Sequence, residues 1–444
     1  MRIVIVGAGE VGSHLAALLS KEEQDIVLVD NDTEKLDPLD AKYNLLTICG
    51  HPTSFETIRR ADAANCDLFV AVTPYETDNV TACIIAKSMG AKRTVARVDN
   101  FEYMMDCNRR FFKEHGVDSV IYPEYYAAKE ICTALTHTWV RHWFEMWGGE
   151  LILIGVKLRE NAEIIGLNLK EFSKRGHSFH VSAIRRRYDT IIPGGDTVIN
   201  SGDIVYFMTR PEHVDELRRI CGKTETEIHS VMVMGANRIT SRLCSELGDK
   251  YKIKIVDSDR KKCQRLAERI SDIDVVCGDP RDNELLMEEN IENMDAFVAL
   301  SDSSETNILG CLTAKELGVK KTIAEVESIQ YIGEAEALNI GTIINKKLLA
   351  AGAIFQLMLD NDVDNSKVMS LADAEVAELE VKPGAKITRA AVRDLKLSHD
   401  MTIAGLIRNG VGRLVDGNTR IEPGDRVVVF CLNGAIHKFE RLFN

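Results

Sequence analysis

The chain has 444 residues and a formal net charge of −13 at pH 7, from 68 acidic and 55 basic side chains. This acidity argues against a nucleic-acid partner, because binding to phosphate backbones needs a basic surface. No run of roughly 18 apolar residues is present to span a membrane, and the first strand pattern starts at residue 2, so we expect no signal peptide. Eleven cysteines without a C-x-x-C pair favour a reducing cytosol over a disulfide framework.

The chain opens on a nucleotide-binding pattern. Residues 2–12 read RIVIVGAGEVG, an apolar strand followed by Gly7, Gly9 and Gly12 in G-x-G-x-x-G spacing. In this motif the glycines allow a tight turn, a close approach of backbone to pyrophosphate and close helix–strand packing. The helix that follows presents free N–H groups to phosphates. The next strand ends at Asp30, 21 residues after Gly9 (30 − 9), where a carboxylate accepts hydrogen bonds from ribose hydroxyls.

Strands and helices alternate over the first 121 residues. We predict strands at 2–6, 26–30, 45–48, 68–72, 94–98 and 119–121. This alternation indicates a doubly wound parallel sheet, which binds ligands outside the carboxyl ends of its strands. Thr73 follows one strand and Arg97 lies late in the next, so both are candidates to face the cleft. The alternatives are a turn or helix-cap role for Thr73 and an ion pair for Arg97.

Residues 123–147 change in character. They are predicted to form one long helical segment with Trp139, Trp143 and Trp147, whose spacing of four places them on one helical face. Such a stripe either packs on its own lobe or forms a contact between subunits.

A small β-rich lobe follows. Residues 184–207 combine period-2 apolar runs with GG and SGD turns, which predicts short antiparallel strands. The basic run at 185–187 is interpreted as a solvated face. His177 and His180 lack neighbouring ligands at metal-binding spacing, so we predict surface histidines and no metal site.

The second half of the chain repeats the first. Gly235 in VMVMGANRIT matches Gly7 at an offset of 228 (235 − 7), and residues 407–430 resemble residues 184–207. Three more pairs fit the repeat: Thr73 with Ser301, Asn79 with Asn307 and, after a one-residue deletion, Asp30 with Asp257. A fixed long-range offset indicates an internal duplication.

The predicted fold is α/β, with two doubly wound, Rossmann-like parallel-sheet domains, each followed by a small, β-rich α+β domain. The expected boundaries are 1–122 for the first Rossmann-like domain, 123–147 for a helical crossover, 148–222 for the first small domain, 229–345 for the second Rossmann-like domain, 346–367 for a second crossover and linker, and 368–444 for the second small domain. Residues 361–367 form the polar linker.

The second nucleotide pattern departs from the first at three positions. Asn237 replaces Gly9, Thr240 replaces Gly12 and Glu325 replaces Arg97. Asparagine tolerates left-handed backbone, so we expect the turn to survive. Thr240 is expected to loosen the helix–strand approach and Glu325 to repel phosphate, with Arg238 compensating in part. The second cleft is therefore predicted to bind more weakly or to choose another ligand.

These motifs, in this tandem order, resemble the RCK family, the regulators of potassium conductance. The resemblance rests on GAGEVG at 7–12, VD at 29–30, AVTPYETDN at 71–79, ARV at 96–98 and the PGD-type turns. Two such units in one chain are similar to the TrkA family of Trk potassium-uptake systems. The resemblance implies a homotetrameric ring of regulatory subunits, peripheral on the cytoplasmic face of the membrane, under an integral-membrane potassium-translocating subunit.

The resemblance also implies NAD(H), or else ATP or ADP, in the clefts. The implied ligand residues of the first lobe are Gly7, Ala8, Gly9, Glu10, Val11, Gly12, Asp30, Thr73 and Arg97, and those of the second are Gly235, Ala236, Asn237, Arg238, Ile239, Asp257 and Ser301. Asp30 favours a free ribose 2′-hydroxyl, hence NAD(H) over NADP(H), but ATP and ADP present the same ribose.

We therefore predict a non-enzymatic nucleotide sensor that gates a potassium-uptake protein. One alternative is a regulator of another cation channel or antiporter. Another is an NAD-dependent oxidoreductase, which is disfavoured because no motif for proton transfer follows either glycine pattern and the lobe after each is small.

Overall fold

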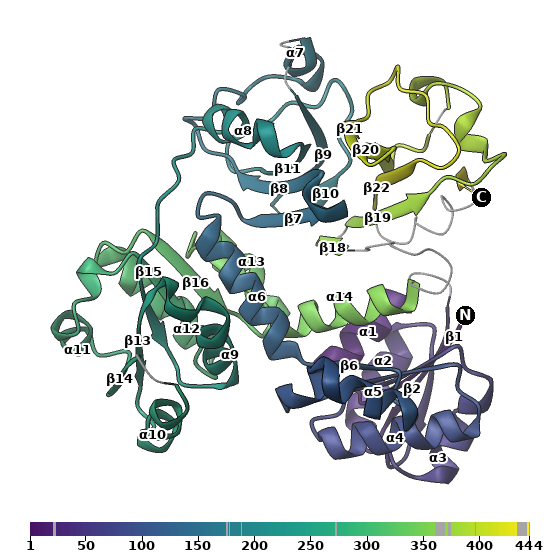
Figure 1. Ribbon diagram of the computed structural model, residues 1–444, viewed down its shortest axis with the longest axis vertical. Helices are drawn as coiled ribbons and strands as arrows, with labels where there is room; N and C mark the ends of the chain where they lie inside the picture. Colours follow the sequence, from purple (N-terminus) through teal and green to yellow (C-terminus); the bar gives the residue numbers. More distant parts are fainter. Residues whose placement is uncertain are drawn as a thin grey trace. The chain divides into compact units, whose positions relative to one another are not determined.

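The computed structural model describes residues 1–20, 24–174, 176, 178–187, 189–270, 273–359, 369–371, 374–395, 397–432 and 442–443. The chain divides into two compact units. The first unit comprises Met1–Tyr126 and Lys346–Asp364, and the second unit comprises Ala127–Asn345 and Asn365–Asn444. A helix from late in the sequence therefore belongs to the same unit as the N-terminal lobe (Figure 1).

The first unit is built on a six-stranded sheet in the order β3-β2-β1-β4-β5-β6. Its strands are β1 Arg2–Val6, β2 Asp25–Asp30, β3 Leu46–Cys49, β4 Leu68–Ala71, β5 Arg93–Arg97 and β6 Ser119–Ile121, and all pair in parallel. The expected strands are confirmed to within one residue at each end. The strand order reverses between β1 and β4, and a crevice for ligands forms at this point of such sheets.

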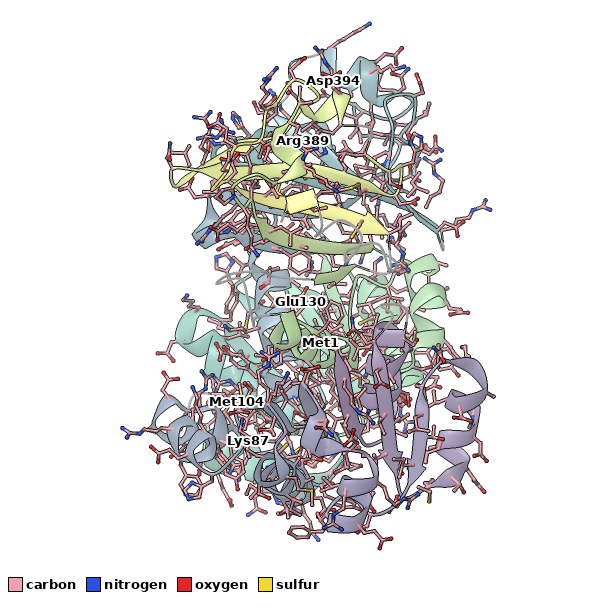
Figure 2. The ribbon with its side chains drawn as sticks, turned by 90° about the vertical axis from the view of Figure 1, so that its right-hand side faces the viewer. Met1, Lys87, Met104, Glu130, Arg389 and Asp394 are labelled. Atoms are coloured by element: carbon pink, nitrogen blue, oxygen red, sulfur yellow. The ribbon has the colours of Figure 1, made fainter. Side chains whose placement is uncertain are left out.

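Helices cover the sheet of the first unit, because its strands are continuous apolar runs that need burial on both faces. They are α1 Glu10–Ser20, α2 Thr33–Lys42, α3 Phe55–Arg60, α4 Glu76–Met89, α5 Asp106–Glu114 and, from the second half of the chain, α14 Lys346–Leu359, which packs on α1. Lys87 of α4, labelled in Figure 2, donates from Nζ to Asp118 Oδ2 at 2.8 Å and ties this helix to the start of β6.

The second unit holds a sheet with the same topology, in the order β14-β13-β12-β15-β16-β17. Its elements are β12 Ser230–Met234, α9 Arg238–Leu247, β13 Lys252–Asp257, α10 Arg260–Arg269, β14 Asp274–Cys277, α11 Asn283–Glu288, β15 Ala296–Ala299, α12 Ser304–Glu316, β16 Lys321–Glu325, α13 Ile329–Ala337 and β17 Thr342–Ile344. Side-chain caps begin the helices at equivalent places: Asp32 precedes α2 and Asp259 precedes α10. The internal duplication is thus confirmed at the level of topology.

Two five-stranded antiparallel sheets complete the second unit, in the orders β10-β9-β11-β8-β7 and β18-β19-β22-β20-β21. Their elements are β7 His142–Met146, β8 Leu151–Lys157, α7 Leu169–Lys174, β9 Phe179–Arg186, β10 Asp189–Ile191, β11 Ile204–Thr209, α8 Val214–Ile220, β18 Met369–Leu371, β19 Ala374–Glu380, β20 Met401–Arg408, β21 Val411–Leu414 and β22 Arg426–Leu432. Short 3-10 helices lie at Ala63–Asn65, Phe101–Met104, Trp147–Gly149, Pro211–His213, Gly248–Lys250, Ile291–Asn293, Lys386–Thr388 and Val392–Asp394.

The same ion pair fastens the turn of each small lobe. Arg186 holds Asp203 through two hydrogen bonds, Nε–Oδ1 at 2.9 Å and Nη2–Oδ2 at 2.7 Å. Arg408 holds Asp425 in the same way at 2.8 and 2.7 Å. Both aspartates are 2% exposed and belong to the SGD and PGD turns of the sequence repeat. The predicted antiparallel strands and their turns are therefore confirmed in both lobes.

The single helix expected over 123–147 is wrong. Helix α6 covers Pro123–Thr136, and Trp143 lies on strand β7, which pairs with β8. Trp139 is 7% exposed and packs in the core of the first small lobe. Trp143 stacks on His137, with 3.7 Å between the centroids of the two rings. Antiparallel pairing with the next strand, β8, has overridden the helical period. Trp139 and Trp143 thus follow the alternative in which they pack on their own lobe.

The solvated face expected for residues 185–187 is wrong for two of its three arginines. Arg185 pairs with Glu336 at 2.8 Å and Arg186 with Asp203, whereas Arg187 is exposed. His180 is also no surface residue: burial lowers its pKa to about 4, and Nδ1 lies 3.0 Å from Val415 O. His177 and the linker 361–367 lie outside the described residues. None of the helices in the described ranges is long and apolar enough to span a bilayer.

Candidate nucleotide-binding clefts

The turn after β1 requires glycine at its first position. Gly7 adopts φ +108, and a Cβ built there would lie 2.9 Å from the backbone N of Thr73. Side chains rarely tolerate this backbone conformation, and glycine adopts it without strain. The turn therefore passes directly over the loop that follows β4, at the point where the strand order reverses.

The other two glycines of the motif have different surroundings. A Cβ at Gly12 would lie 1.8 Å from Gly7 O, so the first turn of α1 touches the glycine turn itself. A Cβ at Gly9 would meet no atom within 4 Å. The backbone at Gly9 thus borders open space at the N-terminus of α1, where a phosphate approaches in such motifs.

Asp30 closes the turn from the neighbouring strand. Its Oδ2 accepts a hydrogen bond from Ala8 N at 2.6 Å, and its Oδ1 accepts one from Asp32 N at 3.0 Å. An ionised carboxylate offers about four acceptor positions, so two bonds to the backbone leave room for ligand hydroxyls. Asp30 therefore fixes the glycine turn in addition to any role toward a ribose.

Thr73 and Arg97 are joined through Asn79, which the sequence analysis did not assign to the cleft. The Asn79 amide accepts from Thr73 N at 2.9 Å and Thr73 Oγ1 at 2.7 Å. It donates to Thr73 O and to Arg97 O, both at 3.0 Å, and is fully buried. This asparagine clamp holds the ends of β4 and β5 together. The pairing of Asn79 with Asn307 in the repeat was the signal that pointed to it.

Two predicted ligand residues of the first cleft already have partners in the protein. Arg97 Nη2 lies 3.3 Å from Asp99 Oδ1, which is the ion pair weighed as its alternative role. Glu10, the first residue of α1, forms an ion pair with Lys347 of α14. The N-terminus of α1 is thus linked by charge to a helix from the other half of the chain.

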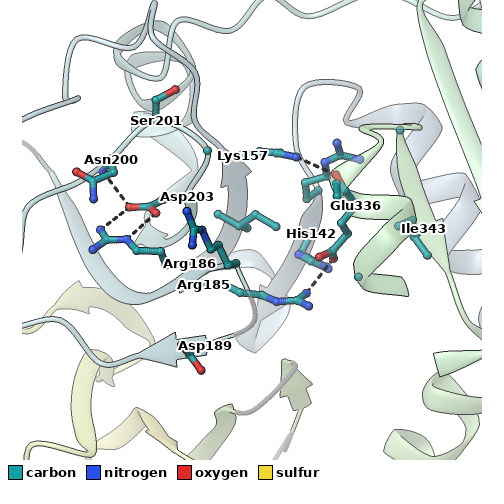
Figure 3. A pocket seen from close by; sticks show the side chains of 17 residues that line it. His142, Lys157, Arg185, Arg186, Asp189, Asn200, Ser201, Asp203, Glu336 and Ile343 are labelled. Carbon is teal, nitrogen blue, oxygen red and sulfur yellow. Dashed lines mark hydrogen bonds and ion pairs between the residues drawn. The ribbon is translucent and has the colours of Figure 1, made fainter. Parts of the chain in front are cut away.

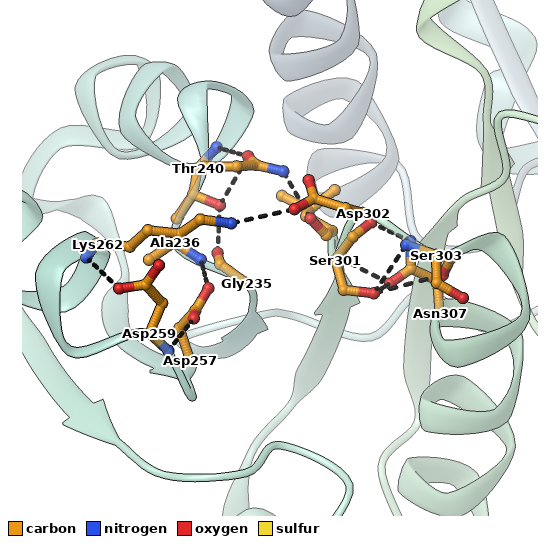
Figure 4. A network of polar contacts seen from close by, with 12 residues as sticks. Gly235, Ala236, Thr240, Asp257, Asp259, Lys262, Ser301, Asp302, Ser303 and Asn307 are labelled. Atoms are coloured by element: carbon orange, nitrogen blue, oxygen red, sulfur yellow. Dashed lines mark hydrogen bonds and ion pairs between the residues drawn. The ribbon is translucent and has the colours of Figure 1, made fainter.

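The second cleft repeats the turn and its carboxylate (Figure 4). Gly235 has φ +106, and Asp257 Oδ2 accepts from Ala236 N at 2.6 Å. Asp257 Oδ1 accepts from Asp259 N at 2.7 Å. The arrangement matches that of Asp30 bond for bond.

Asn237 does not adopt the left-handed backbone considered for it. Its φ and ψ are −110 and −171, an extended conformation, and it caps α9 by accepting from Thr240 N at 3.1 Å. Its Nδ2 also donates to Leu300 O at 2.6 Å, after β15. The position needs no positive φ in either lobe, so the side chain is free to serve as a helix cap.

Thr240 ties the helix to the turn, where only loosening was expected. It is fully buried, and its hydroxyl donates to Gly235 O at 2.6 Å (Figure 4). In the first cleft the backbone of Gly12, which has no side chain, lies directly against the backbone carbonyl of Gly7. In the second, Thr240 carries a Cβ, and its hydroxyl forms a hydrogen bond with Gly235 O in place of that backbone contact.

The asparagine clamp recurs in the second cleft. Asn307 accepts from Ser301 N at 2.8 Å and Ser301 Oγ at 2.7 Å, and donates to Ser301 O and Glu325 O at 2.9 Å. An ion pair of 3.0 Å joins Lys262 of α10 to Asp302, which follows Ser301 (Figure 4). Sequence reasoning did not single out this pair, which links the two sides of the strand-order reversal.

The fold and the clefts define the chain as a tandem repeat, in which a Rossmann-like domain with a nucleotide-type cleft precedes a small antiparallel lobe. Comparison with known families agrees. The TrkA-N domain matches residues 3–123 and 231–346, and the TrkA-C domain matches residues 153–222 and 376–444. The chain belongs to the TrkA family, and the resemblance inferred from its motifs is confirmed.

Known relatives cover the whole chain. It is 30% identical over 449 residues to a Trk system potassium uptake protein TrkA homologue of Archaeoglobus fulgidus, with full coverage of both chains. Among solved structures, the GsuK RCK domain is similar with a TM-score of 0.62 and 15% identity, covering 100% of this chain and 94% of that one. The GsuK channel bound to NAD has a TM-score of 0.60 and 14% identity, with 100% and 78% covered. The predicted RCK-type fold is confirmed.

Proposed function

We propose that the chain is a regulatory subunit that binds NAD(H) in its first cleft and thereby gates a membrane potassium-uptake protein. The observation that carries this proposal is the first cleft itself: the backbone at Gly9 borders open space, while Asp30 keeps acceptor positions beside the glycine turn. Gly7, Ala8, Val11 and Gly12 would shape the phosphate side, and Asp30 would bind the ribose. ATP and ADP carry the same ribose and are the alternative ligands for this cleft.

The relatives support both parts of the proposal. The Archaeoglobus homologue is named for potassium uptake, and one GsuK structure contains NAD. We place the chain in the cytoplasm, attached to the membrane through an integral-membrane, Trk-type subunit and assembled as a homotetrameric ring. Regulation, rather than hydride transfer, is the proposed outcome of nucleotide binding.

The link between ligand and conformation is proposed to be the Glu10–Lys347 ion pair. Glu10 begins α1, where the phosphates are expected, and Lys347 belongs to α14, which packs on that helix. An arriving pyrophosphate repels Glu10 and attracts Lys347, so nucleotide binding changes how α14 is held. A ligand shifts a conformational equilibrium only through different affinities for its two states, and this ion pair provides such a difference.

Binding is tested by calorimetric titration of the full chain with NADH, NAD⁺, ADP and ATP. Gly9→Asp places a carboxylate in the open space and is expected to abolish high-affinity binding. Gly194→Asp is the matched control, because a Cβ at this exposed glycine also meets no atom within 4 Å. Equal affinity in wild type and Gly9→Asp would place the nucleotide elsewhere.

Gating is tested by co-purifying the chain with a Trk-type membrane subunit and measuring potassium flux in proteoliposomes. Lys347→Met removes the cation that the pyrophosphate attracts, so it is expected to weaken nucleotide binding without abolishing it and to lose the nucleotide dependence of the flux. Light scattering of the purified chain is expected to give four copies per particle. A strict monomer at micromolar concentration would contradict the ring.

A further inference from the structure

A small cavity in the second unit is lined by an unusual concentration of positive charge. Its volume is about 190 Å³, and seven of its 14 lining residues are lysine or arginine, with no Asp or Glu among the described residues that form it. The whole chain has a net charge of −13, so this concentration is local and runs against the overall composition.

The first small lobe contributes four of these cations. Arg141 precedes β7, Lys157 ends β8, Arg159 follows two residues later and Lys223 lies after α8. The second Rossmann-like lobe contributes Lys315 of α12 and the adjacent pair Lys320 and Lys321 at the start of β16. All seven residues belong to the second unit.

Neutral acceptors hold several of these side chains in place. Lys321 Nζ donates to Thr342 Oγ1 at 3.1 Å and to Thr138 O at 3.2 Å. Lys315 Nζ donates to Asn339 O at 2.7 Å, and Arg141 Nη2 donates to Asn339 Oδ1 at 3.1 Å. These bonds fix the positions of the cations without neutralising them, and Glu336, outside the cavity lining, is the carboxylate whose charge favours the protonated forms of Arg141 and Lys157.

A neighbouring cavity also contains arginines, but two of them form ion pairs with carboxylates. This larger cavity, of about 1080 Å³, is drawn in Figure 3. The lining residues of the two cavities include Arg141 and Lys157 in common. Two of its own three arginines have carboxylate partners, since Arg185 pairs with Glu336 and Arg186 with Asp203, while Arg187 is exposed. In the small cavity none of the seven cations lies within ion-pair distance of a carboxylate in the ranges that the structure describes.

The protonation of the lysines reflects this crowding. Burial first, and then the charge of Arg141, lowers the pKa of Lys321 to about 7. Burial followed by the charges of Arg159 and Arg141 lowers the pKa of Lys315. A multivalent anion would relieve this repulsion, because an opposite charge at close range favours the charged form of each lysine.

We propose that this cavity binds a compact, polyvalent phosphate: pyrophosphate itself or the phosphate chain of a nucleotide. Its volume lies below the roughly 300–1,000 Å³ of sites for drug-sized ligands, which suits a small anion. The site differs from the second cleft, because Lys321 and Thr342 lie at the starts of β16 and β17, and the cleft forms at the carboxyl ends of the parallel strands. Bound phosphate would join the small lobe to the Rossmann-like lobe.

The test is calorimetric titration of the full chain with pyrophosphate in a phosphate-free chloride buffer. The expected result is one saturable site per chain outside the nucleotide clefts, still present in Gly9→Asp. The double substitution Arg159→Ala/Lys223→Ala is expected to weaken binding at least tenfold. Lys250→Ala removes an exposed lysine of the second Rossmann-like lobe, outside the cavity, and is expected to leave the affinity unchanged.

Competition identifies the source of the phosphate. Displacement of pyrophosphate by ATP in the Gly9→Asp protein assigns the site to a nucleotide phosphate chain, and a lack of displacement assigns it to free pyrophosphate. If the double variant has a lowered melting temperature, Lys320→Ala, at an exposed residue of the cavity rim, repeats the comparison. The proposal is overturned if wild type shows no saturable binding, or if the cavity variants bind pyrophosphate as tightly as Lys250→Ala does.

Discussion

Asp30 illustrates how one side chain serves both the fold and the proposed ligand. Its carboxylate accepts from Ala8 N at 2.6 Å, so it holds the glycine turn even before a nucleotide binds. Asp30→Ala is expected to weaken NAD(H) binding by roughly 1.5–3 kcal/mol, the range for a hydrogen bond to a charged group. Asp30→Asn keeps an acceptor for the turn and separates the two roles. Unchanged affinity in calorimetric titration of Asp30→Ala would leave Asp30 with a structural role alone.

Lys321 gives stability a dependence on pH that can be assigned to one residue. Its pKa is lowered to about 7 in the folded chain from the ordinary lysine value of 10.5, so folding disfavours its protonated form. The resulting penalty is complete below pH 7 and is relieved as pH rises from about 7 toward 10.5. Lys321→Met is therefore expected to stabilise the chain by on the order of 3 kcal/mol at pH 6, after the loss of its hydrogen bonds.

The measurement is urea unfolding of wild type and Lys321→Met at a series of pH values in phosphate-free buffer. The difference in the free energy of unfolding should shrink steadily between pH 7 and 10.5. A difference that stays constant over this range would show that Lys321 is not the titrating group.

At the scale of elements, local sequence patterns were sufficient to predict most strands, because apolar runs and period-2 alternation repeat at fixed spacing along the chain. The strands of both parallel sheets follow from apolar runs ended by turn residues, and the antiparallel lobes follow from period-2 runs such as 184–207. The helix predicted over 123–147 is an exception: residues 142–146 form β7, which pairs with the next strand β8, and the helical spacing of the tryptophans masked this local hairpin. The cationic cavity was not predicted for a different reason: its lysines and arginines come from segments scattered between residues 141 and 321, which only the tertiary fold brings together.

The asparagine clamp is the element-scale feature with the clearest energetic consequence. Asn79 joins the ends of β4 and β5 through four hydrogen bonds and is fully buried. Asn79→Ala leaves several polar groups without partners and is expected to destabilise the chain by about 3 kcal/mol, since each unsatisfied buried group costs about 1–3 kcal/mol. Asn65→Ala, at an exposed asparagine, is the control. Equal urea midpoints for the two variants would show that water replaces the clamp.

At the scale of the whole molecule, the two halves of the sequence are not the two halves of the structure. Helix α14 comes from the second half and packs on α1 in the first unit. The core of the small lobes is shared, with Leu151 and Met208 of one packed with Val428 and Phe430 of the other. A chain cut between residues 222 and 229 would divide both units. The two clefts therefore have to be compared within the intact chain.

The two clefts are expected to be unequal, with the first dominant. Gly9 leaves the phosphate approach open, whereas Asn237 places a side chain there and uses it as a helix cap and a donor to Leu300 O. In the full chain, Gly9→Asp should therefore abolish high-affinity NAD(H) binding. Asn237→Asp preserves an acceptor for the cap, adds a negative charge to the second cleft and should leave the high-affinity site intact. Calorimetric stoichiometry of both variants decides the matter. The opposite result is high-affinity binding that survives Gly9→Asp and disappears in Asn237→Asp. It would mean that Asn237 and Thr240 have adapted the second cleft to its ligand, because their hydrogen bonds to Leu300 and Gly235 would then pre-organise that cleft.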